Sequence, residues 1–547
     1  MKITTTAYIL FFVLGLSFAG AQEVQLPEQP AVEYNDDNVS AETDNKQDES
    51  TQAPGRYQIT DVEYNITGIT RKYAVALDIK IDKRRIFESE AELMGYVADL
   101  RQQFLNQRNF ASSSVDFTVT APESDGIGKV TLYVSTTDTH HFLGVPYPKY
   151  NSNSGLNMKI KLKDTNFLGS LHTMSSDVSF AIEDKDDDDN SSGKDYKLGL
   201  SMAFDIPFGA GPFEIDWINS WSISYTIGKS SPEWNASTGL EFSLPFDTYS
   251  LVWLFQQESI HNFDYKKYDD DVYFTELAKF SIPIKLQYID NWGYVTYTPY
   301  VSTKYTWDRN GISSNNPDLK TGPVNTVGHT LSTGRVDWTD NWKRNFRNGM
   351  SFSFGQSMGY NTDTDQIMPH IDGEAKIFIA FKNLGMNMDA YAFANQHDTE
   401  NIGSRLRGIR DDQKFDSDYG LGDTKALSTE MAIVINMDMP IHIFTFDFDN
   451  TKYLKFLHIF NCEVQFSPFM DIAFTKNKAT GNTFWYKDGW YAGGLEVLVF
   501  PQKWRSLVVR GSVGVDLGRY LLKSKIDTDW RRNVSKYEIE IGVGLHY

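Results

Sequence analysis

The sequence ends in YEIEIGVGLHY, residues 537–547, and this stretch alternates strictly between two kinds of side chain. Successive side chains of a β-strand point to opposite faces, so the stretch predicts a strand with one oily face and one wet face. Aromatic residues at a strand end are typical of barrels that cross a membrane, where they lie at the interface. The apolar parity is Tyr537, Ile539, Ile541, Val543, Leu545 and Tyr547, and the polar or small parity is Glu538, Glu540, Gly542, Gly544 and His546.

The other end of the chain has the pattern of a secretory signal peptide, which we place at residues 1–21. Lys2 is followed by an apolar run, residues 8–18, and then by the small residues Ala19-Gly20-Ala21. The alternative is an N-terminal membrane anchor, for which this apolar run is short. No later stretch holds eighteen consecutive apolar residues, so the sequence predicts no transmembrane helix.

Composition excludes several classes of function. The formal net charge of −20 argues against a nucleic-acid partner, which favours a basic surface. The single cysteine, Cys462, has no second cysteine with which to form an internal disulfide. No Ser-His-Asp, paired-histidine or phosphate-loop pattern is found, so we expect no enzyme activity, no catalytic residue, no metal site and no cofactor.

Two segments separate the signal peptide from the rest of the chain. Residues 22–55 are rich in acidic residues and poor in large apolar ones, which predicts a disordered linker. Residues 56–140 predict a small α+β domain, with strands at 57–65 and 73–81 and two closing strands. Its helix begins at a capping box, where Ser89 lies three residues before Glu92.

From residue 141 to residue 547, helical periodicity gives way to recurring strand-like runs. Short turns, such as residues 207–212, alternate with long polar links, such as residues 308–326 and 395–425. This inequality is typical of outer-membrane barrels, which have short turns at one end and long loops at the other. We therefore predict an all-β transmembrane barrel of about 16 antiparallel strands, with an upper estimate of about eighteen.

One long loop contains an arginine that a barrel interior would be expected to hold. Arg407 lies between Leu406 and Gly408, and the strands after the loop carry carboxylates on the parity opposite their apolar side chains. A carboxylate facing lipid costs free energy, whereas a guanidinium inside the lumen can bridge two such acids. The alternative is an ordinary Arg-Gly turn on a surface loop, and parity alone leaves both interpretations open.

Leu406, Arg407, Gly408 and Ile409 resemble the Val-Arg-Gly-aromatic signature of the BamA/TamA superfamily, with Leu in place of Val and Ile in place of the aromatic residue. The resemblance implies that Arg407 lies in the lumen against acids of the two following strands. Glu430 and Asp471 lie where these acids are expected, and Glu463 is a rival for the second. A similar tripeptide, residues 509–511, lies within a predicted strand and not in a long loop.

Further stretches carry the same resemblance. Residues 161–171, KLKDTNFLGSL, are similar to the turn after an early strand of these barrels. Residues 56–140 resemble one POTRA domain, the periplasmic module that precedes such barrels, although the sequence predicts one helix where a POTRA domain has two. The implied location is the outer membrane, with the α+β domain in the periplasm.

The resemblance implies a weak seam between the first and last barrel strands. Gly542 and Gly544 weaken the terminal strand, which ends at Tyr547, and Pro146 and Pro148 each remove a backbone donor from the first. An edge exposed there would template the strand of a client protein. The expected function is insertion of outer-membrane proteins, and the expected partners are unfolded outer-membrane protein clients, membrane lipid and periplasmic accessory proteins. The alternatives are export of a passenger polypeptide through the lumen, and a passive pore or structural surface protein.

Overall fold

In the computed structural model the described part of the chain forms one compact unit within Ala53–Tyr547. The predicted signal peptide, all but the last residue of the predicted linker, and Tyr547 lie outside the described residues. The structure describes residues 55–120, 126–151, 155–184, 194–229, 231–261, 272–289, 292–308, 323–339, 344–411, 413–422, 424–449, 455–532 and 537–546.

The N-terminal α+β region is a four-stranded sheet in the order β2-β1-β4-β3, with β1 and β4 parallel and the other neighbours antiparallel. One face of the sheet and the longer helix share a continuous apolar core. The elements are β1 (Arg56–Thr67), α2 (Lys72–Asp78), β2 (Ile86–Phe87), α3 (Glu90–Asn106), β3 (Phe110–Thr120) and β4 (Ile127–Asp138).

Helix α3 begins where the capping box predicts. The side chain of Ser89 accepts a hydrogen bond from the backbone N–H of Glu92 at 3.2 Å, which satisfies one of the free donors of the first turn. Leu93, Val97 and Leu100 recur at helical spacing and are fully buried against the sheet.

The expectation of a strand at residues 73–81 is wrong, because most of this segment is the helix α2. Val75 on the helix and Ile79, the residue that follows it, are both buried in the core of the region. A short apolar run fits either periodicity, so its neighbours in the fold decide which one forms. The region therefore has two helices where the sequence predicted one.

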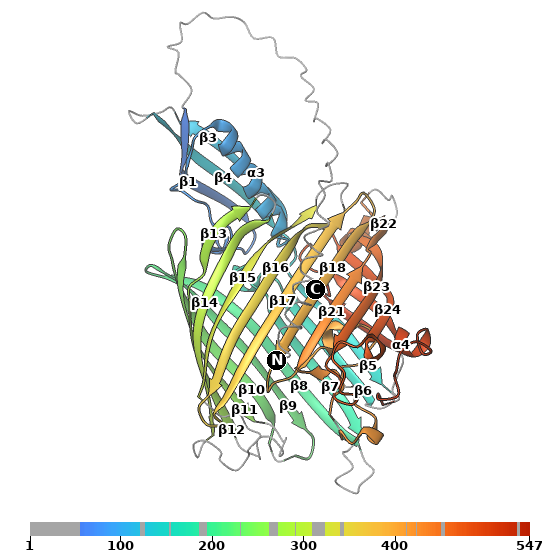
Figure 1. Cartoon of the computed structure of the whole chain (residues 1–547). Coiled ribbons are helices and arrows are strands. Elements are labelled where there is room, and N and C mark those ends of the chain that lie inside the picture. Colours follow the sequence, from blue (N-terminus) through green and yellow to red (C-terminus); the bar gives the residue numbers. More distant parts are fainter. Residues whose placement is uncertain are drawn as a thin grey trace, which may run out of the picture. The chain divides into compact units, whose positions relative to one another are not determined.

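The rest of the described chain is a closed antiparallel barrel (Figure 1). Among the described residues, twenty labelled strands occupy eighteen positions, because β12 with β13, and β21 with β22, are two halves of one position. The count exceeds the predicted sixteen and matches the upper estimate. The first half consists of β5 (Phe142–Asn151), β6 (Gly155–Asp164), β7 (Met174–Asp184), β8 (Lys194–Ala210), β9 (Phe213–Thr226), β10 (Glu233–Pro245), β11 (Ser250–His261), β12 (Val272–Ser281), β13 (Ile284–Ile289) and β14 (Gly293–Asp308).

The second half of the barrel carries the loop that contains Arg407, which lies between β18 and β21. It consists of β15 (Val324–Thr339), β16 (Phe346–Asn361), β17 (Gln366–Ala380), β18 (Gly385–Asn395), β21 (Met431–Asp438), β22 (Ile441–Phe446), β23 (Cys462–Thr475), β24 (Trp490–Pro501), β25 (Val509–Asp516) and β26 (Tyr537–Val543). Outside the barrel order are the short pair β19 (Glu400–Asn401) and β20 (Ser428–Thr429) and the helix α4 (Leu517–Tyr520).

Prolines explain both divided positions. Pro283 separates β12 from β13, and Pro440 separates β21 from β22. Because proline has no backbone N–H, it interrupts a ladder that otherwise continues along the same neighbour, β14 in the first case and β23 in the second.

The outer surface of the barrel is apolar along alternate positions. Leu198 and Leu200 on β8, like Ile539 on β26, expose their side chains, and the residues between them are polar or small. This is the pattern of a barrel whose outside contacts lipid. Among the described residues, no helix has the length and apolar character of a membrane span.

Candidate functional site

The loop between β18 and β21 folds into the barrel instead of extending outward. Ile402, Leu406 and Ile409 are at most 3 % exposed and belong to an apolar cluster with Trp490 and Trp530. Burying these side chains stabilises the loop by the ordinary hydrophobic term. The cluster fixes the backbone on both sides of Arg407, so the position of that side chain is set by packing as well as by charge.

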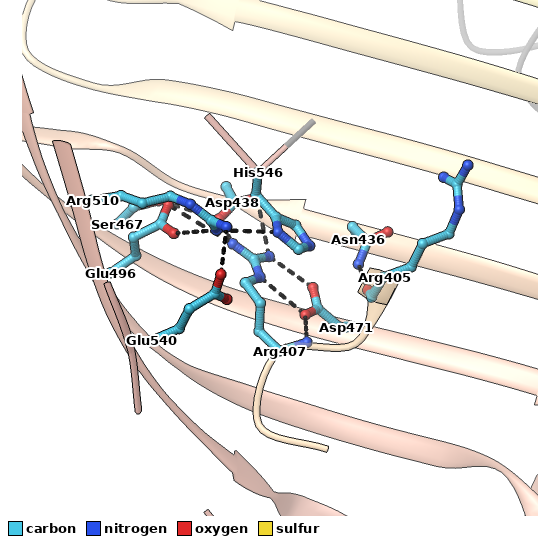
Figure 2. Close-up of polar contacts among 10 residues, drawn as sticks. All are labelled: Arg405, Arg407, Asn436, Asp438, Ser467, Asp471, Glu496, Arg510, Glu540 and His546. Carbon is cyan, nitrogen blue, oxygen red and sulfur yellow. Dashed lines mark hydrogen bonds and ion pairs between the residues drawn. The ribbon is translucent and has the colours of Figure 1, made fainter. Parts of the chain in front are cut away.

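Arg407 is buried between two aspartates that come from neighbouring strand positions (Figure 2). Its Nε and Nη2 donate to the two oxygens of Asp471 at 3.0 and 2.7 Å, a bidentate contact. Its Nη1 donates to Asp438 at 2.7 Å, and Nη2 also reaches the second oxygen of Asp438 at 3.3 Å. The backbone N–H of Arg407 donates to Asp471 at 2.9 Å, so Asp471 holds the main chain of the loop too.

The cluster is buried, and this burial strengthens the attraction between its charged groups. Arg407 is 3 % exposed and Asp471 fully buried, and the ring of Phe469 lies 3.9 Å from the guanidinium carbon. Attraction between charges is weakly screened away from water, while a buried charge without a partner is costly. The three groups therefore satisfy one another, and removal of one leaves the others uncompensated.

Gly408 is required by a close approach between the loop and strand β25. Its φ is +89°, a conformation that favours glycine, and a Cβ built there would lie 2.4 Å from the carbonyl carbon of Gly514. A Cβ on Gly514 would in turn lie 2.7 Å from the Cα of Gly408. Two facing glycines thus allow the loop backbone to touch the wall of the barrel.

The charged cluster continues beyond Arg407 to a second arginine (Figure 2). Glu496 lies 4.0 Å from Arg407 and 3.4 Å from Arg510, which also binds Glu540 at 3.0 Å. The tripeptide at residues 509–511 is not the loop signature, yet its arginine belongs to the same network. Asp438, Glu496 and Glu540 were not predicted as partners of these arginines, although their strand parity identifies them as inward-facing.

The expectation that Glu430 pairs with Arg407 is wrong. Glu430 binds Lys476 at 2.6 Å, and both side chains are partly exposed. The register of β21 and β23 gives the reason, because Asn436 pairs with Asp471 and the inward acid closest to that level is Asp438. Parity selected the correct face of the strand, but it carries no information on depth along the barrel. The rival acid Glu463 contacts Asn345, His442 and Gln465 and not Arg407.

The terminal strand shows two different uses of glycine. Gly542 lies opposite Arg510 on β25, and a Cβ there would be 2.8 Å from Nε of that arginine. This glycine makes room for the side chain that links Glu496 to Glu540. Gly544 has a φ of +102°, and its N–H donates to the carbonyl of Val508 at the end of the strand.

The closure between β26 and β5 has an unusual shortage of backbone donors on one side. The carbonyl of His141 accepts a hydrogen bond from the N–H of Thr165, so it points toward β6. The carbonyl of Phe142 accepts one from the side chain of Trp504, so it points to the other side of β5. In a strand the N–H and C=O of one residue share a direction, which alternates along the chain. The even positions of β5 therefore face β26, and two of them are Pro146 and Pro148.

β26 and β5 are hydrogen-bonded neighbours in the closed order, but within the described part of the chain no continuous register of paired residues runs between them. The neighbouring pairs β5–β6 and β25–β26 both have continuous registers. Among the described residues, no group of three or more His, Cys, Asp or Glu side chains is arranged to hold a metal ion.

No protein-family model and no curated protein matches the sequence. Among solved structures, the chain is similar to CdiB from Acinetobacter baumannii, at 9% identity and a TM-score of 0.43, over 89% of this chain and 73% of that one. It is also similar to BamA from Haemophilus ducreyi lacking POTRA domains 1–3, at 10% identity and a TM-score of 0.32, over 88% of this chain and 84% of that one. CdiB from Escherichia coli aligns at 9% identity with a TM-score of 0.35, over 91% and 92% of the two chains.

Proposed function

We propose that this chain is an outer-membrane protein that assists the insertion of other barrel proteins, by pairing a client strand at the seam between β5 and β26. The N-terminal α+β region is then periplasmic, and the clients are unfolded outer-membrane proteins. The observation that carries the proposal is the direction of Pro146 and Pro148, whose missing N–H groups face β26.

The seam has the physical properties that strand exchange needs. Fewer ladder bonds between β5 and β26 lower the cost of separating these two strands, since each bond contributes about 0.5–1.5 kcal/mol. An opened edge presents unpaired N–H and C=O groups beside lipid, where an extended client segment can satisfy them. The process exchanges hydrogen bonds and breaks no covalent bond, so it needs no catalytic residue.

Export through the lumen and passive conduction agree less well with the interior. The loop around Arg407 fills part of the lumen, and its apolar cluster and ion network hold it there. A passenger polypeptide would require this loop to leave, at the cost of separating buried charges, and a loop that stays in place restricts the space left for ions. Opening at the seam leaves the cluster intact.

A disulfide across the seam tests the proposal. In a Cys462→Ser background, Gly144→Cys is combined with Ile539→Cys or with Ile541→Cys, since all three positions face outward. We expect the cross-linked protein to lose its support for insertion of other barrels into cells or proteoliposomes, and to regain it on reduction. Full insertion activity with the seam cross-linked contradicts the proposal.

The matched control is a disulfide between two strands that need not separate. Val513 and Ile539 are paired in the register of β25 and β26, and both side chains are exposed on the outer face. Val513→Cys with Ile539→Cys introduces the same chemistry one strand away. We expect normal insertion from this variant, which separates an effect of the seam from an effect of oxidation.

A further inference from the structure

A polar pocket lies where the N-terminal α+β region meets the barrel, well away from the cluster around Arg407. Its volume is about 170 Å³. Leu105 of helix α3 and Arg108, just after that helix, line one side of the pocket, and the other lining residues come from the barrel and its links. Six of the lining residues carry its chemistry: Arg108, Trp338, Arg344, Asn345, Glu463 and Arg505.

The three guanidiniums of this pocket are held by neutral groups. Arg108 donates to the backbone carbonyl of Arg505 and, at 2.8 Å, to the side chain of Asn345, and its guanidinium stacks 4.2 Å over the ring of Trp338. Arg505 donates to the carbonyls of Phe110 and Ala111.

Arg344 has the least complete set of partners. It donates through Nη1 to the hydroxyl of Thr445 at 3.2 Å, and its Nε is buried without a hydrogen-bond partner. Within the described part of the chain, neither Arg344 nor Arg108 nor Arg505 forms an ion pair with a carboxylate. A buried donor without an acceptor is costly, so this pocket has donors to offer to a ligand.

The one acid in the pocket is already satisfied by other groups. Both oxygens of Glu463 accept hydrogen bonds, from the backbone and side chain of Asn345, from the side chain of Gln465 and through contact with His442. Glu463 is 3 % exposed and makes no direct contact with the three arginines. The pocket therefore keeps an excess of two positive charges.

The electrostatics of Arg108 agree with this excess. Burial and, to a smaller extent, the nearby charge of Arg505 together lower the pKa of Arg108 to about 9, and the charge of Glu463 opposes the change. A lowered arginine pKa means that the surroundings disfavour the cation. An anion placed among the guanidiniums relieves that cost, since an opposite charge nearby favours the charged form.

We propose that this pocket binds a phosphate dianion, as free inorganic phosphate or as the monoester of a larger molecule. Guanidinium groups match phosphate oxygens through forked, charge-assisted hydrogen bonds. A dianion balances the two excess charges, whereas a carboxylate or a phosphodiester carries only one. The volume accommodates a phosphate group with a small substituent. The site is independent of the seam and of strand insertion.

Calorimetric titration of the full-length protein in detergent, in low-chloride buffer, tests the site directly with inorganic phosphate and with glycerol 1-phosphate as probes. We expect saturable binding of one equivalent. Equal affinity for the two probes assigns the site to the free ion, and tighter binding of the ester assigns it to a phosphomonoester group. Absence of saturable binding of either probe overturns the proposal.

Two pocket variants should shift the affinity in opposite directions. Arg344→Gln removes the guanidinium with the fewest contacts and should weaken phosphate binding about tenfold or more. Glu463→Gln removes the negative charge and should strengthen it, a gain that misfolding does not produce. The control is Arg84→Gln, which changes an exposed arginine that binds Asp247 outside the pocket and should leave the affinity unchanged. Equal affinity in the wild type and Arg344→Gln contradicts the assignment.

Discussion

At the scale of single residues, Arg407 is the side chain on which the interior of the barrel depends most. We predict that Arg407→Ala lowers the free energy of unfolding by about 3–5 kcal/mol, because Asp438 and Asp471 would be left buried without a cation. The measurement is the temperature at which the barrel loses its compact form, followed by the heat-dependent shift in gel migration. An unchanged transition temperature contradicts the structural role of the cluster.

The matching control is the exposed pair formed by Glu430 and Lys476. Glu430→Gln should change stability by less than about 0.5 kcal/mol, because exposed ion pairs contribute little. Asp438→Asn should be strongly destabilising by comparison. A larger loss of stability from Glu430→Gln than from Asp438→Asn would indicate that Glu430, as expected from the sequence, is the partner of Arg407, and would contradict the pairing of Arg407 with Asp438.

A second residue-scale prediction concerns Gly408. Gly408→Ala should destabilise the barrel beyond the cost of its positive φ, because the new Cβ would overlap the backbone of Gly514. Gly420→Ala is the control, since Gly420 also has a positive φ, +65°, but has open space around it. The control should cost about 1–2 kcal/mol. If both variants have the same transition temperature, the contact between loop and strand is not needed.

The residues of the site show which information a sequence contains. Alternation identified the inward parity of residues 430–438, which Glu430 and Asp438 share. The choice between them depends on which residue of β21 lies beside Asp471, and that is set by the register of Asn436 against Asp471. Register arises from the pairing of strands separated by a long loop, which local pattern does not specify.

At the scale of elements, the prolines of β5 should limit the strength of the closure. We predict that Pro146→Val combined with Pro148→Val restores two donors toward β26 and raises the stability of the barrel by about 0.5–1.5 kcal/mol per bond. Insertion of client proteins should fall at the same time, because the seam opens less often. The measurements are thermal unfolding and the rate of client insertion in proteoliposomes.

A proline elsewhere in the barrel wall provides the control for the β5 double variant. Pro283 interrupts the position shared by β12 and β13, inside the barrel wall and far along the strand order from the seam. Pro283→Val should leave client insertion unchanged. If Pro283→Val lowers client insertion, or if the β5 double variant leaves it unchanged, then the number of backbone donors at the seam does not control insertion.

Elements with a local signal were predicted well, and the others were not. Helix α3 was found because a capping box and four apolar positions at helical spacing agree. Helix α2 was mistaken for a strand because its seven residues are too few to distinguish the two periods, and contact with the sheet decides its form. The long loop was identified, and its inward position was expected from the resemblance of residues 406–409, but no local pattern specifies the contacts with Trp490 and Trp530 that hold it there.

At the scale of the whole molecule, aromatic contacts narrow one end of the barrel interior. Trp338 on β15 packs at 6.2 Å against Phe500 on β24, and these two strands are not neighbours in the barrel order. We predict that Phe500→Ala increases the ionic conductance of the protein in planar bilayers. Phe255→Ala, which alters a side chain 54 % exposed on the outer wall, should have no such effect. Equal conductance of the wild type, Phe500→Ala and Phe255→Ala would show that the contact between Trp338 and Phe500 does not limit the passage of ions.

The size of the barrel was the global property least accessible from sequence. Strand-like runs gave about sixteen to eighteen positions, and the structure has eighteen among its described residues. Two strands divided by a proline, such as β12 and β13, occupy one position, so the number of strands does not equal the number of positions. Whether two runs share one position is decided by their common neighbour and not by either run alone.

The facing glycines also bear on what a truncated chain would lack. Asp438 and Asp471 both precede residue 472, so a chain that extends through β23 contains both aspartates that bind Arg407. The contact between Gly408 and Gly514 needs β25 as well, which lies roughly a hundred residues after the loop. A chain truncated before β25 therefore keeps the partners of the arginine but lacks the backbone contact that presses the loop against the barrel wall.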